Sequence, residues 1–377
     1  MSERIPVGFL RHNFLHRSES WLYSSMQGLE EGGRYHVRVF ALRRHLAERF
    51  PWTDVTLLGG AAQAWYWLTR RAPAFTRWAK SVRLIHAHLG PTGPFAMAGA
   101  LAAGVPFVVS YYGHDVVMFR TRERFEPWAW WYTLLRRRVF ERAARIVVLS
   151  EHMRRALVAQ GAPAEKVDVV RLGVDVTRFA GAARAPRDAT RPLRVLMVGR
   201  EVDKKGFDDG LAACRGAIDR GVPCEVTMLG TGGPLAGYLR LKARSLGVDV
   251  RWLEPAHPVP AAMAHADVLL APSRTAADGD EEGTPTVIVE AGAAGLPVVS
   301  TRHAGIPEQV DDGRTGLLAA ERDIWGLTEA LVTVARDPPR AHAMGAAGRE
   351  RMTRDHSLAA HRARLHAVYD AVLSEAA

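Results

Sequence analysis

Two glutamates with seven residues between them, Glu282 and Glu290, lie in the stretch DGDEEGTPTVIVEAGAAGLPVVST, residues 278–301. A helix is expected to begin between them, and its first turn offers unpaired amides and a partial positive charge that favour a phosphate. Glu290 then lies roughly 8 Å down the helix axis, within reach of a ribose hydroxyl. Glu282, on the other side of the phosphate, can meet the hydroxyls of a sugar. The spacing indicates a site for a nucleoside diphosphate sugar, although two glutamates this far apart also occur by chance.

The elements that position this pair follow from cap and turn chemistry. Thr284 is expected to cap the helix, because its hydroxyl can accept a hydrogen bond from a first-turn amide. Pro285 suits the first helical position, where the missing N–H costs nothing. Gly295 ends the helix, Pro297 prevents its continuation, and the apolar residues from Val298 onward predict a buried strand.

Positive charge suited to a phosphate follows another predicted strand, residues 193–198. Arg200 and Lys205 come after its end and before a predicted helix over residues 208–220. Arginine offers a planar fork of donors and lysine a point charge. The two side chains can neutralise a diphosphate at this edge of a sheet, or else be ordinary surface charges.

Small residues at two further strand ends are candidates for contact with the same ligand. The turn Gly230-Thr231-Gly232-Gly233 follows the predicted strand 226–229 and lacks the third glycine of a dinucleotide-binding fingerprint. It is expected to let the backbone approach a base or a ribose. Ser273 follows the predicted strand 268–271.

Short apolar strands also alternate with helices in the N-terminal half, which is typical of a parallel sheet covered on both faces. In such sheets ligands bind at the carboxyl ends of the strands. A small, polar, proline-containing stretch, residues 180–192, predicts a linker between the two halves. The predicted N-terminal strands are residues 5–10, 37–42, 55–58, 84–88, 106–110, 146–149 and 167–171.

Polar residues follow two of these strands. His114 and Asp115 come after strand 106–110 and are candidates for catalysis, whereas His88 and Gly90, at the end of strand 84–88, are candidates for the acceptor side. His86 and His88 share a face, because alternate residues of a strand do. No third metal ligand lies nearby in the sequence, so no metal site is expected.

Length and composition limit the class of protein. The chain has 377 residues, of which 48% are hydrophobic, enough for two domains with a core each. No apolar run approaches the length that spans a bilayer, and the N-terminus lacks the apolar segment of a signal peptide. With two cysteines, Cys214 and Cys224, a reduced cytoplasmic protein is expected rather than a disulfide framework.

Positive charge is concentrated in the N-terminal half. Residues 1–185 hold 27 lysines and arginines against 14 aspartates and glutamates, whereas residues 186–377 hold 23 against 26. Segments 64–83 and 128–145 mix tryptophans with arginines, which suits an anionic membrane surface and a peripheral position on the inner face of the cytoplasmic membrane. Alternatively, the aromatics belong to the core and the arginines to a solvated face. No nucleic acid is expected as a partner, because no recognition motif is present.

Together these motifs resemble the family-four retaining glycosyltransferases, whose GT-B fold has two Rossmann-like, doubly wound α/β domains that face a central cleft. The resemblance covers nearly the whole chain and is densest over residues 272–318, which include the family's pair of glutamates as Glu282 and Glu290. VGREVDKKGF supplies the family's phosphate site as Arg200 and Lys205, and LIHAHLGPTG and RLGVDVTRF match further segments. Stretch 272–318 looks most like that of enzymes that assemble capsule, exopolysaccharide and lipopolysaccharide.

The resemblance implies transfer of a sugar from a nucleoside diphosphate sugar to a hydroxyl of a glycan, glycolipid or lipid-linked acceptor, with no cofactor and no metal. Arg200 and Lys205 would neutralise the leaving diphosphate, which would take the acceptor proton. Glu290 would hold the ribose and Glu282 the donor sugar. The backbone that would meet the phosphates belongs to Gly283, Thr284, Pro285 and Thr286, with Gly230, Gly232 and Ser273 nearby.

The resemblance also implies an acceptor-binding domain at residues 1–180, a donor-binding domain at residues 193–355, and a C-terminal helix over residues 356–377 that packs back on the first domain. Tyr112 occupies the place of the family's usual histidine, and His114 is a candidate to replace it. Glu19 lies in a position that resembles a loop of polysaccharide-assembling members.

Three alternatives concern the reaction. A nucleotide-sugar 2-epimerase on the same architecture would bind the same donor but would need no basic acceptor-binding half. A transferase acting on a soluble small-molecule acceptor is a further possibility. Asp278-Gly279-Asp280 imitates the metal motif of another glycosyltransferase fold, but it directly precedes the glutamate pair and comes late in the chain, so no divalent metal is expected to be required.

Overall fold

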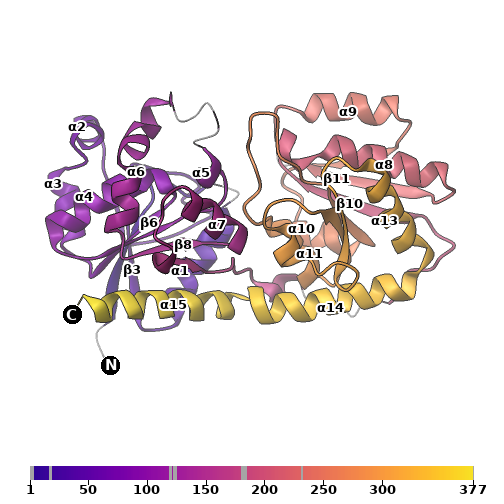
Figure 1. Ribbon diagram of the computed structural model, residues 1–377. Coiled ribbons are helices and arrows are strands. Elements are labelled where there is room, and N and C mark those ends of the chain that lie inside the picture. The colour runs from indigo at the N-terminus through magenta and orange to yellow at the C-terminus, as the bar shows by residue number, and fades with distance from the viewer. Residues whose placement is uncertain are drawn as a thin grey trace. The chain divides into compact units, whose positions relative to one another are not determined.

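The computed structural model in Figure 1 describes residues 4–16, 19–118, 121, 125–179, 185–230 and 232–376, the side chain of Trp128 excepted. The chain divides into two units, Met1–Gly173 with Leu358–Ala377, and Val174–Ser357. Each unit is built on a parallel sheet, one of seven strands and one of six. The two-domain, doubly wound α/β fold predicted from the sequence is confirmed. Residues 180–184 of the predicted linker lie outside the described residues.

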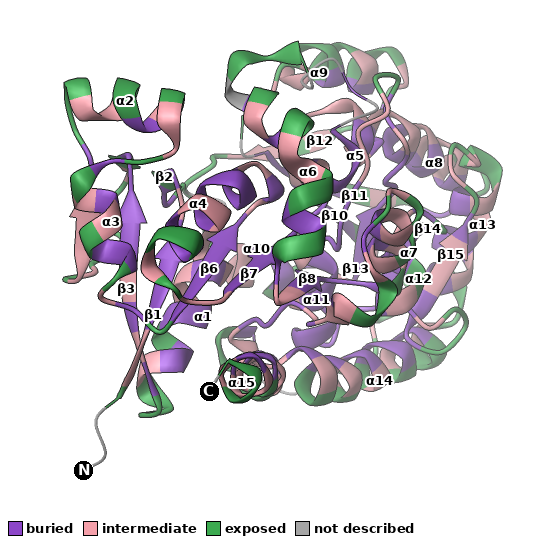
Figure 2. Ribbon diagram, turned by 60° about the vertical axis from the view of Figure 1, so that its left-hand side comes forward, coloured by how far each residue is buried: buried purple, intermediate pink, exposed green. Residues whose placement is uncertain are grey.

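The seven strands of the first unit follow the order β5-β3-β1-β6-β7-β8-β9, and the helices that connect parallel strands cover the sheet. The central strands β6 and β7 are buried along their whole length, as the purple ribbon of Figure 2 shows. The strands are β1 (Ile5–Leu10), β3 (Tyr35–Ala41), β5 (Val55–Leu57), β6 (Leu84–His88), β7 (Phe107–Ser110), β8 (Arg145–Val148) and β9 (Val167–Val169), beside the small pair β2 (Asn13–Phe14) and β4 (Arg43–Arg44). The helices are α1 (Ser20–Glu31), α2 (Ala61–Thr69), α3 (Pro73–Ala79), α4 (Gly93–Ala103), α5 (His114–Val117), α6 (Trp130–Arg142) and α7 (Glu151–Ala159).

A glycine in β1 allows the sheet to pack closely against α3. A Cβ atom on Gly8 would lie 2.7 Å from the ring of Trp78, which is almost fully buried. For Trp78, therefore, the interpretation of the tryptophan-rich segment 64–83 as core is correct. The same segment also contains Trp65, which is more than half exposed.

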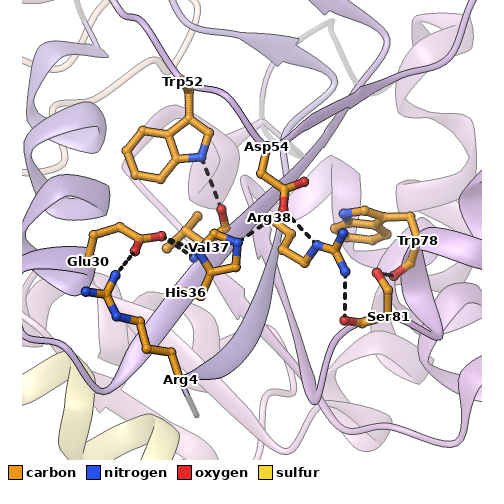
Figure 3. A network of polar contacts seen from close by, with 9 residues as sticks. All are labelled: Arg4, Glu30, His36, Val37, Arg38, Trp52, Asp54, Trp78 and Ser81. Atoms are coloured by element: carbon orange, nitrogen blue, oxygen red, sulfur yellow. Dashed lines mark hydrogen bonds and ion pairs between the residues drawn. The ribbon is translucent and has the colours of Figure 1, made fainter. Parts of the chain in front are cut away.

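A polar network fixes strand β3, which lies between β1 and β5, to its surroundings (Figure 3). The ring of His36 lies between two carboxylates, with Nδ1 2.9 Å from Glu30 Oε1 and Nε2 3.1 Å from Asp54 Oδ2. Arg38 also donates to Asp54, at 2.9 Å, and the indole N–H of Trp52 donates to a carbonyl of β3 at 3.1 Å. These bonds join β3 to α1 and to the segment that leads into β5.

The C-terminal helix α15 (Leu358–Glu375) belongs to the first unit, where it packs beside α1. Its buried face carries Tyr369, whose hydroxyl lies 2.6 Å from Nδ1 of His86 in the central strand β6. His361 Nε2 lies 2.8 Å from the hydroxyl of Ser25 in α1. The chain thus returns to complete the N-terminal core.

The six strands of the second unit follow the order β12-β11-β10-β13-β14-β15, all parallel. The pattern predicts most of these elements but misses α9, α10, α12 and β15. The strands are β10 (Leu193–Gly199), β11 (Cys224–Gly230), β12 (Val250–Leu253), β13 (Val268–Ala271), β14 (Val298–Thr301) and β15 (Gly316–Ala319). The helices are α8 (Phe207–Asp219), α9 (Ala236–Ser245), α10 (Val259–Ala264), α11 (Thr286–Ala293), α12 (Ile306–Gln309), α13 (Ile324–Arg336) and α14 (Pro338–His356).

Helix α11 is buried on most of its surface, and its two ends differ in how well the sequence predicts them. The predicted stop is confirmed, because Gly295 has a φ of +70° and the amide of Leu296 donates to the carbonyl of Ala291 at 2.9 Å. The predicted cap is wrong. Pro285 is the N-cap residue, with no side-chain cap, and the helix begins at Thr286 rather than at the proline that follows Thr284.

Candidate active site

A buried ion pair lies at the carboxyl edge of the second sheet. Lys205 belongs to a short 3-10 helix (Asp203–Lys205) that follows β10, and its Nζ is 2.9 Å from Oε1 of Glu282. Only 9% of Glu282 is exposed. Burial acts to raise the pKa of this carboxyl, but the charges of Lys205 and Lys204 outweigh it and lower the pKa overall. Glu282 is therefore held as a carboxylate that can accept hydrogen bonds.

The loop that presents Lys205 is fixed by its own ion pairs. Arg274, which is almost buried, contacts Asp203 and Asp209 at 2.6 Å each. Lys204 turns the other way from its neighbour and contacts Asp280 at 2.9 Å. Asp280 belongs to the stretch that imitates a metal motif, and its carboxylate is thus engaged by a lysine.

A histidine that the sequence reasoning missed holds the backbone of the glutamate loop. Nε2 of the buried His303 accepts the amide N–H of Glu282 at 3.0 Å, so Nδ1 carries the proton and donates it to Glu321 at 2.6 Å. Glu321 also accepts the amide of Thr275 at 2.8 Å. The signal available in the sequence was the place of His303, two residues after the end of the buried strand β14.

The N-terminus of α11 lies next to the ion pair of Lys205 and Glu282 and carries a hydroxyl group, that of Thr284, which can both donate and accept a hydrogen bond. Thr284 is only 8% exposed, and within the described ranges its hydroxyl has no hydrogen-bond partner. In the first turn, the amide of Ile288 donates to the carbonyl of Pro285 at 3.2 Å, and the amides before it have no carbonyl within the helix to bind. Gly283 and Pro285 are buried beside them. Unpaired donors at a helix N-terminus are suited to an anion.

Glu290 lies one turn further along α11 and is half-buried. Burial raises its pKa to about 7, against the opposing charges of Arg178 and Lys205. Arg178 lies in a short 3-10 helix (Val176–Phe179) that packs on α11. Arg178 belongs to the segment RLGVDVTRF, which matches the family, but no role was predicted for it.

The remaining candidates of the second unit lie at neighbouring strand ends. Arg200 is exposed, and no residue in the described part of the chain contacts its guanidinium in a hydrogen bond or an ion pair. Gly230 is the last residue of β11, and Gly232 has a φ of +88°, while Thr231 between them lies outside the described residues. Ser273, buried after β13, accepts a hydrogen bond from Thr301 through its carbonyl.

Asp115 ties together two strand ends in the first unit. Its buried carboxylate accepts the amides of Gly90 at 2.9 Å, Tyr112 at 2.9 Å and Gly113 at 3.1 Å. Burial raises the pKa of Asp115, and these amides oppose the increase. The carboxylate thus positions the segments after β6 and β7, and His114 begins the helix α5 beside it.

His88 and Tyr112 form a buried pair next to this junction, with Nδ1 of the histidine 2.6 Å from the phenol oxygen. Their neighbour His86 contacts Ser110 at 2.6 Å through Nε2. The rings of His86 and His88 are 4.1 Å apart, which confirms that they share a face. Burial, with a smaller contribution from the charge of His361, lowers the pKa of His86 to about 3.

Glu19 lies at the start of α1, where it pairs with Arg11 and accepts the amide of His16 at 2.8 Å. Residues 17–18 of this loop lie outside the described residues. Across the described ranges, no group of three or more His, Cys, Asp or Glu side chains could hold a metal ion. In the same residues, no helix combines the length and the apolar character needed to cross a bilayer.

Both halves of the chain match families of known proteins. Residues 192–337 match the family described as glycosyl transferases group 1, and residues 22–173 match the glycosyl transferase 4-like domain. Among solved structures, HepE of Anabaena in complex with UDP and glucose is similar, with a TM-score of 0.77 over 98% of this chain and 100% of that one. Their sequences are 18% identical, so this likeness concerns the fold, which is GT-B.

Two relatives share more of the sequence. A GDP-mannose-dependent alpha-(1-6)-phosphatidylinositol monomannoside mannosyltransferase of Mycolicibacterium smegmatis is 35% identical over 275 residues, which cover 69% of each chain. WcaL of Escherichia coli, named as a candidate colanic acid biosynthesis glycosyltransferase, is 34% identical over 258 residues, or 66% of this chain. The chain spans 61% of the length of WcaL.

Proposed function

The chain belongs to the glycosyl transferases of group 1, and we propose that it moves a sugar from a nucleoside diphosphate sugar to a hydroxyl of a glycan, glycolipid or lipid-linked acceptor in the assembly of a cell-surface polysaccharide. One observation carries this proposal. The buried pair of Lys205 and Glu282 lies beside a helix N-terminus at which the hydroxyl of Thr284 has no hydrogen-bond partner among the described residues. A phosphate and a hydroxylated sugar would satisfy both groups at once.

In the proposed reaction, the oxygen of the acceptor hydroxyl forms a bond to the anomeric carbon as the bond from that carbon to the diphosphate breaks. The acceptor proton passes to a phosphate oxygen on the same face, so the anomeric configuration is retained. Arg200 and Lys205 stabilise the charge that develops on the diphosphate, each by about 2–4 kcal/mol if they act like a single oxyanion donor. The amides at Thr286 hold the phosphate in place.

The two glutamates hold the rest of the donor. Glu282, kept ionised by Lys205, accepts hydrogen bonds from hydroxyls of the sugar, and Glu290 accepts them from the ribose. In the first unit we propose that His114, Tyr112 and Glu19 contact the acceptor. Asp115 acts there as a positioning residue, because all three of its hydrogen bonds go to backbone amides.

A screen of nucleotide sugars tests this function. Purified protein with EDTA is incubated with each donor, and slow release of the nucleoside diphosphate is measured with and without glycan acceptors. Glu290→Gln and Lys205→Met should each lower release at least about 100-fold, since each removes a contact to the transition state. Glu225→Gln, an exposed glutamate of the same sheet, serves as the control. Near-normal activity in both site variants would show that the site is assigned wrongly.

We also propose that the acceptor is reached at an anionic membrane surface through α2 and α6. These helices are joined, because the indole N–H of Trp131 donates to the carbonyl of Trp67 at 2.6 Å and the guanidinium of Arg70 stacks on the Trp131 ring. Figure 2 shows exposed residues in green on both helices. The apolar side chains that are more than half exposed there are Trp65, Leu68, Trp130 and Leu134.

Aromatic and leucine side chains beside arginines are suited to the boundary between headgroups and acyl chains. The test is co-sedimentation with vesicles of phosphatidylcholine alone or mixed with phosphatidylglycerol. Binding should require the anionic lipid, weaken with salt and be lost in Leu134→Glu. The matched control is Leu241→Glu, since Leu241 of α9 is 65% exposed against 73% for Leu134. Equal effects of the two substitutions would contradict this surface.

A further inference from the structure

A second buried carboxylate lies at the same edge of the sheet, and neither the sequence pattern nor the proposed reaction gives it a role. Glu201 directly follows Arg200 after β10, and only 5% of it is exposed. Its Oε2 atom is buried and has no hydrogen-bond partner in the part of the chain that the structure describes. Buried polar groups are normally paired, and an unpaired buried carboxylate is costly. Such a group indicates a ligand that supplies the missing donors.

The position of Glu201 is set by the glycine turn after the neighbouring strand β11. A Cβ atom on Gly230 would collide with the carboxylate of Glu201, and one on Gly233 would collide with its backbone. The amide of Leu235 donates to the carbonyl of Glu201 at 3.0 Å. The turn therefore needs glycines so that Glu201 can pack against it.

This place suits the nucleoside end of the donor. Arg200 and Lys205 follow strand β10, whose two neighbours in the sheet are β13, which leads to α11, and β11, which ends at Gly230. With the diphosphate at the N-terminus of α11 and at the basic residues, the β11 side is the next position along the carboxyl edge. Glu201, Gly230 and Gly233 form that side.

The chemistry of the bases then decides which nucleotide a carboxylate accepts. Guanine presents two N–H donors side by side, at N1 and at the 2-amino group, and both oxygens of a carboxylate can accept them. Uracil presents one N–H between two carbonyl oxygens, which a carboxylate repels. Adenine places a ring acceptor next to its amino group. We propose that Glu201 recognises this edge of guanine and that the donor is a GDP-sugar, an inference that rests on the proposed function.

The experiment is isothermal titration of the whole chain with GDP, UDP and ADP. Wild-type protein should bind GDP at least about tenfold more tightly than the other two, because the wrong base leaves a buried group unpaired. Glu201→Gln should weaken GDP binding by about tenfold and change UDP and ADP binding by less than about threefold. Glu225→Gln is again the control. Equal loss for all three nucleotides would overturn the role of Glu201.

A melting measurement separates a ligand contact from a structural role. Because Glu201→Gln removes an unpaired buried charge, the variant without nucleotide should melt no lower than the wild type. Glu201→Leu is the second variant and should give the same result. A lower melting temperature in both would mean that Glu201 supports the fold instead.

The outcomes also distinguish this inference from the function on which it rests. Tight binding of UDP or ADP in preference to GDP would leave the glycosyltransferase proposal intact and refute the guanine contact. Absence of binding by all three nucleotides, together with no hydrolysis of any nucleotide sugar, would refute both.

Discussion

Removing the charge of Lys205 while keeping the length of its side chain tests whether the buried ion pair with Lys205 stabilises the carboxylate of Glu282. In Lys205→Met the partner at 2.9 Å is lost, and Glu282, only 9% exposed, keeps just the more distant Lys204, which is engaged by Asp280. Breaking a buried pair from one side costs about 3–5 kcal/mol, because the remaining charge is left without compensation. The Lys205 side chain is 17% exposed, so we expect a value near the lower end, about 3 kcal/mol.

Thermal unfolding is the assay. For a domain of about 150–250 residues, 1 kcal/mol corresponds to about 2–4 °C, so Lys205→Met should lower the melting temperature of the second unit by about 6–12 °C. The double variant Lys205→Met with Glu282→Gln has neither charge, and it should recover more than half of this loss while remaining inactive. The pKa of Glu282 should rise in the single variant, because Lys205 is the largest of the charges that lower it.

The exposed pair of Arg194 and Glu225, 3.4 Å apart, provides the control. Arg194→Met should cost less than about 1 kcal/mol, since exposed pairs contribute little. The reasoning would be refuted by a Lys205→Met variant that melts with the wild type. It would equally be refuted by a double variant as unstable as the single one, because the penalty would then not come from the orphaned carboxylate.

Three further predictions concern other groups. His303→Ala should lower donor turnover about 100-fold through the displaced Glu282 loop, with partial recovery in His303→Gln, and unchanged turnover in both would contradict a positioning role. The pKa of Glu290 is raised to about 7, so the folded protein retains a proton that the unfolded chain has lost, and stability should fall as pH rises from about 4.5 to 7. Glu290→Gln should therefore melt higher than the wild type at about pH 8 and no higher at about pH 4.5, and equal shifts at both would refute this. Burial, with the charge of Arg11, lowers the pKa of His12 to about 3. The folded protein therefore loses stability as pH falls below about 6.5, by about 2 kcal/mol at about pH 5. His12→Gln should remove that part of the acid sensitivity, as measured by melting curves.

Much of the sheet could be predicted because its strands are buried on both faces and end at glycines, prolines or turns. The bounds of β1, β6 and β13 agree with the predicted ranges. The missed elements lack this signal. Helix α9 buries only Leu239 and Ala243 of its ten residues, and α10 is a six-residue helix with Pro260 in its first turn, where a proline is tolerated. The strand β15 has only four residues and directly follows a turn, so its apolar run is too short to predict a strand.

In the candidate site, the pattern places charges at the correct strand ends but does not assign their partners. Lys204 and Lys205 are adjacent, and so are Glu281 and Glu282, with Asp280 before them. The packing of the loop after β10 gives Lys204 to Asp280 and Lys205 to Glu282. Gly206, with a φ of +60°, makes that packing possible, because a Cβ there would collide with the carbonyl of Pro272. Contacts of this kind join residues far apart in the chain, and no local spacing encodes them.

The helix cap that the sequence predicts at Thr284 does not form, and its failure is informative. A threonine before a helix normally has its hydroxyl paired. Among the described residues, however, the buried hydroxyl of Thr284 has no partner, and neither has one carboxylate oxygen of Glu201 at the same edge of the sheet. Each such group costs about 1–3 kcal/mol in the protein without ligand. Natural chains break local rules mainly where function requires it. A donor that supplied a phosphate to the helix and N–H groups to Glu201 would offset both penalties. The second unit should therefore gain more stability from the correct nucleoside diphosphate sugar than from its sugar or its phosphate alone.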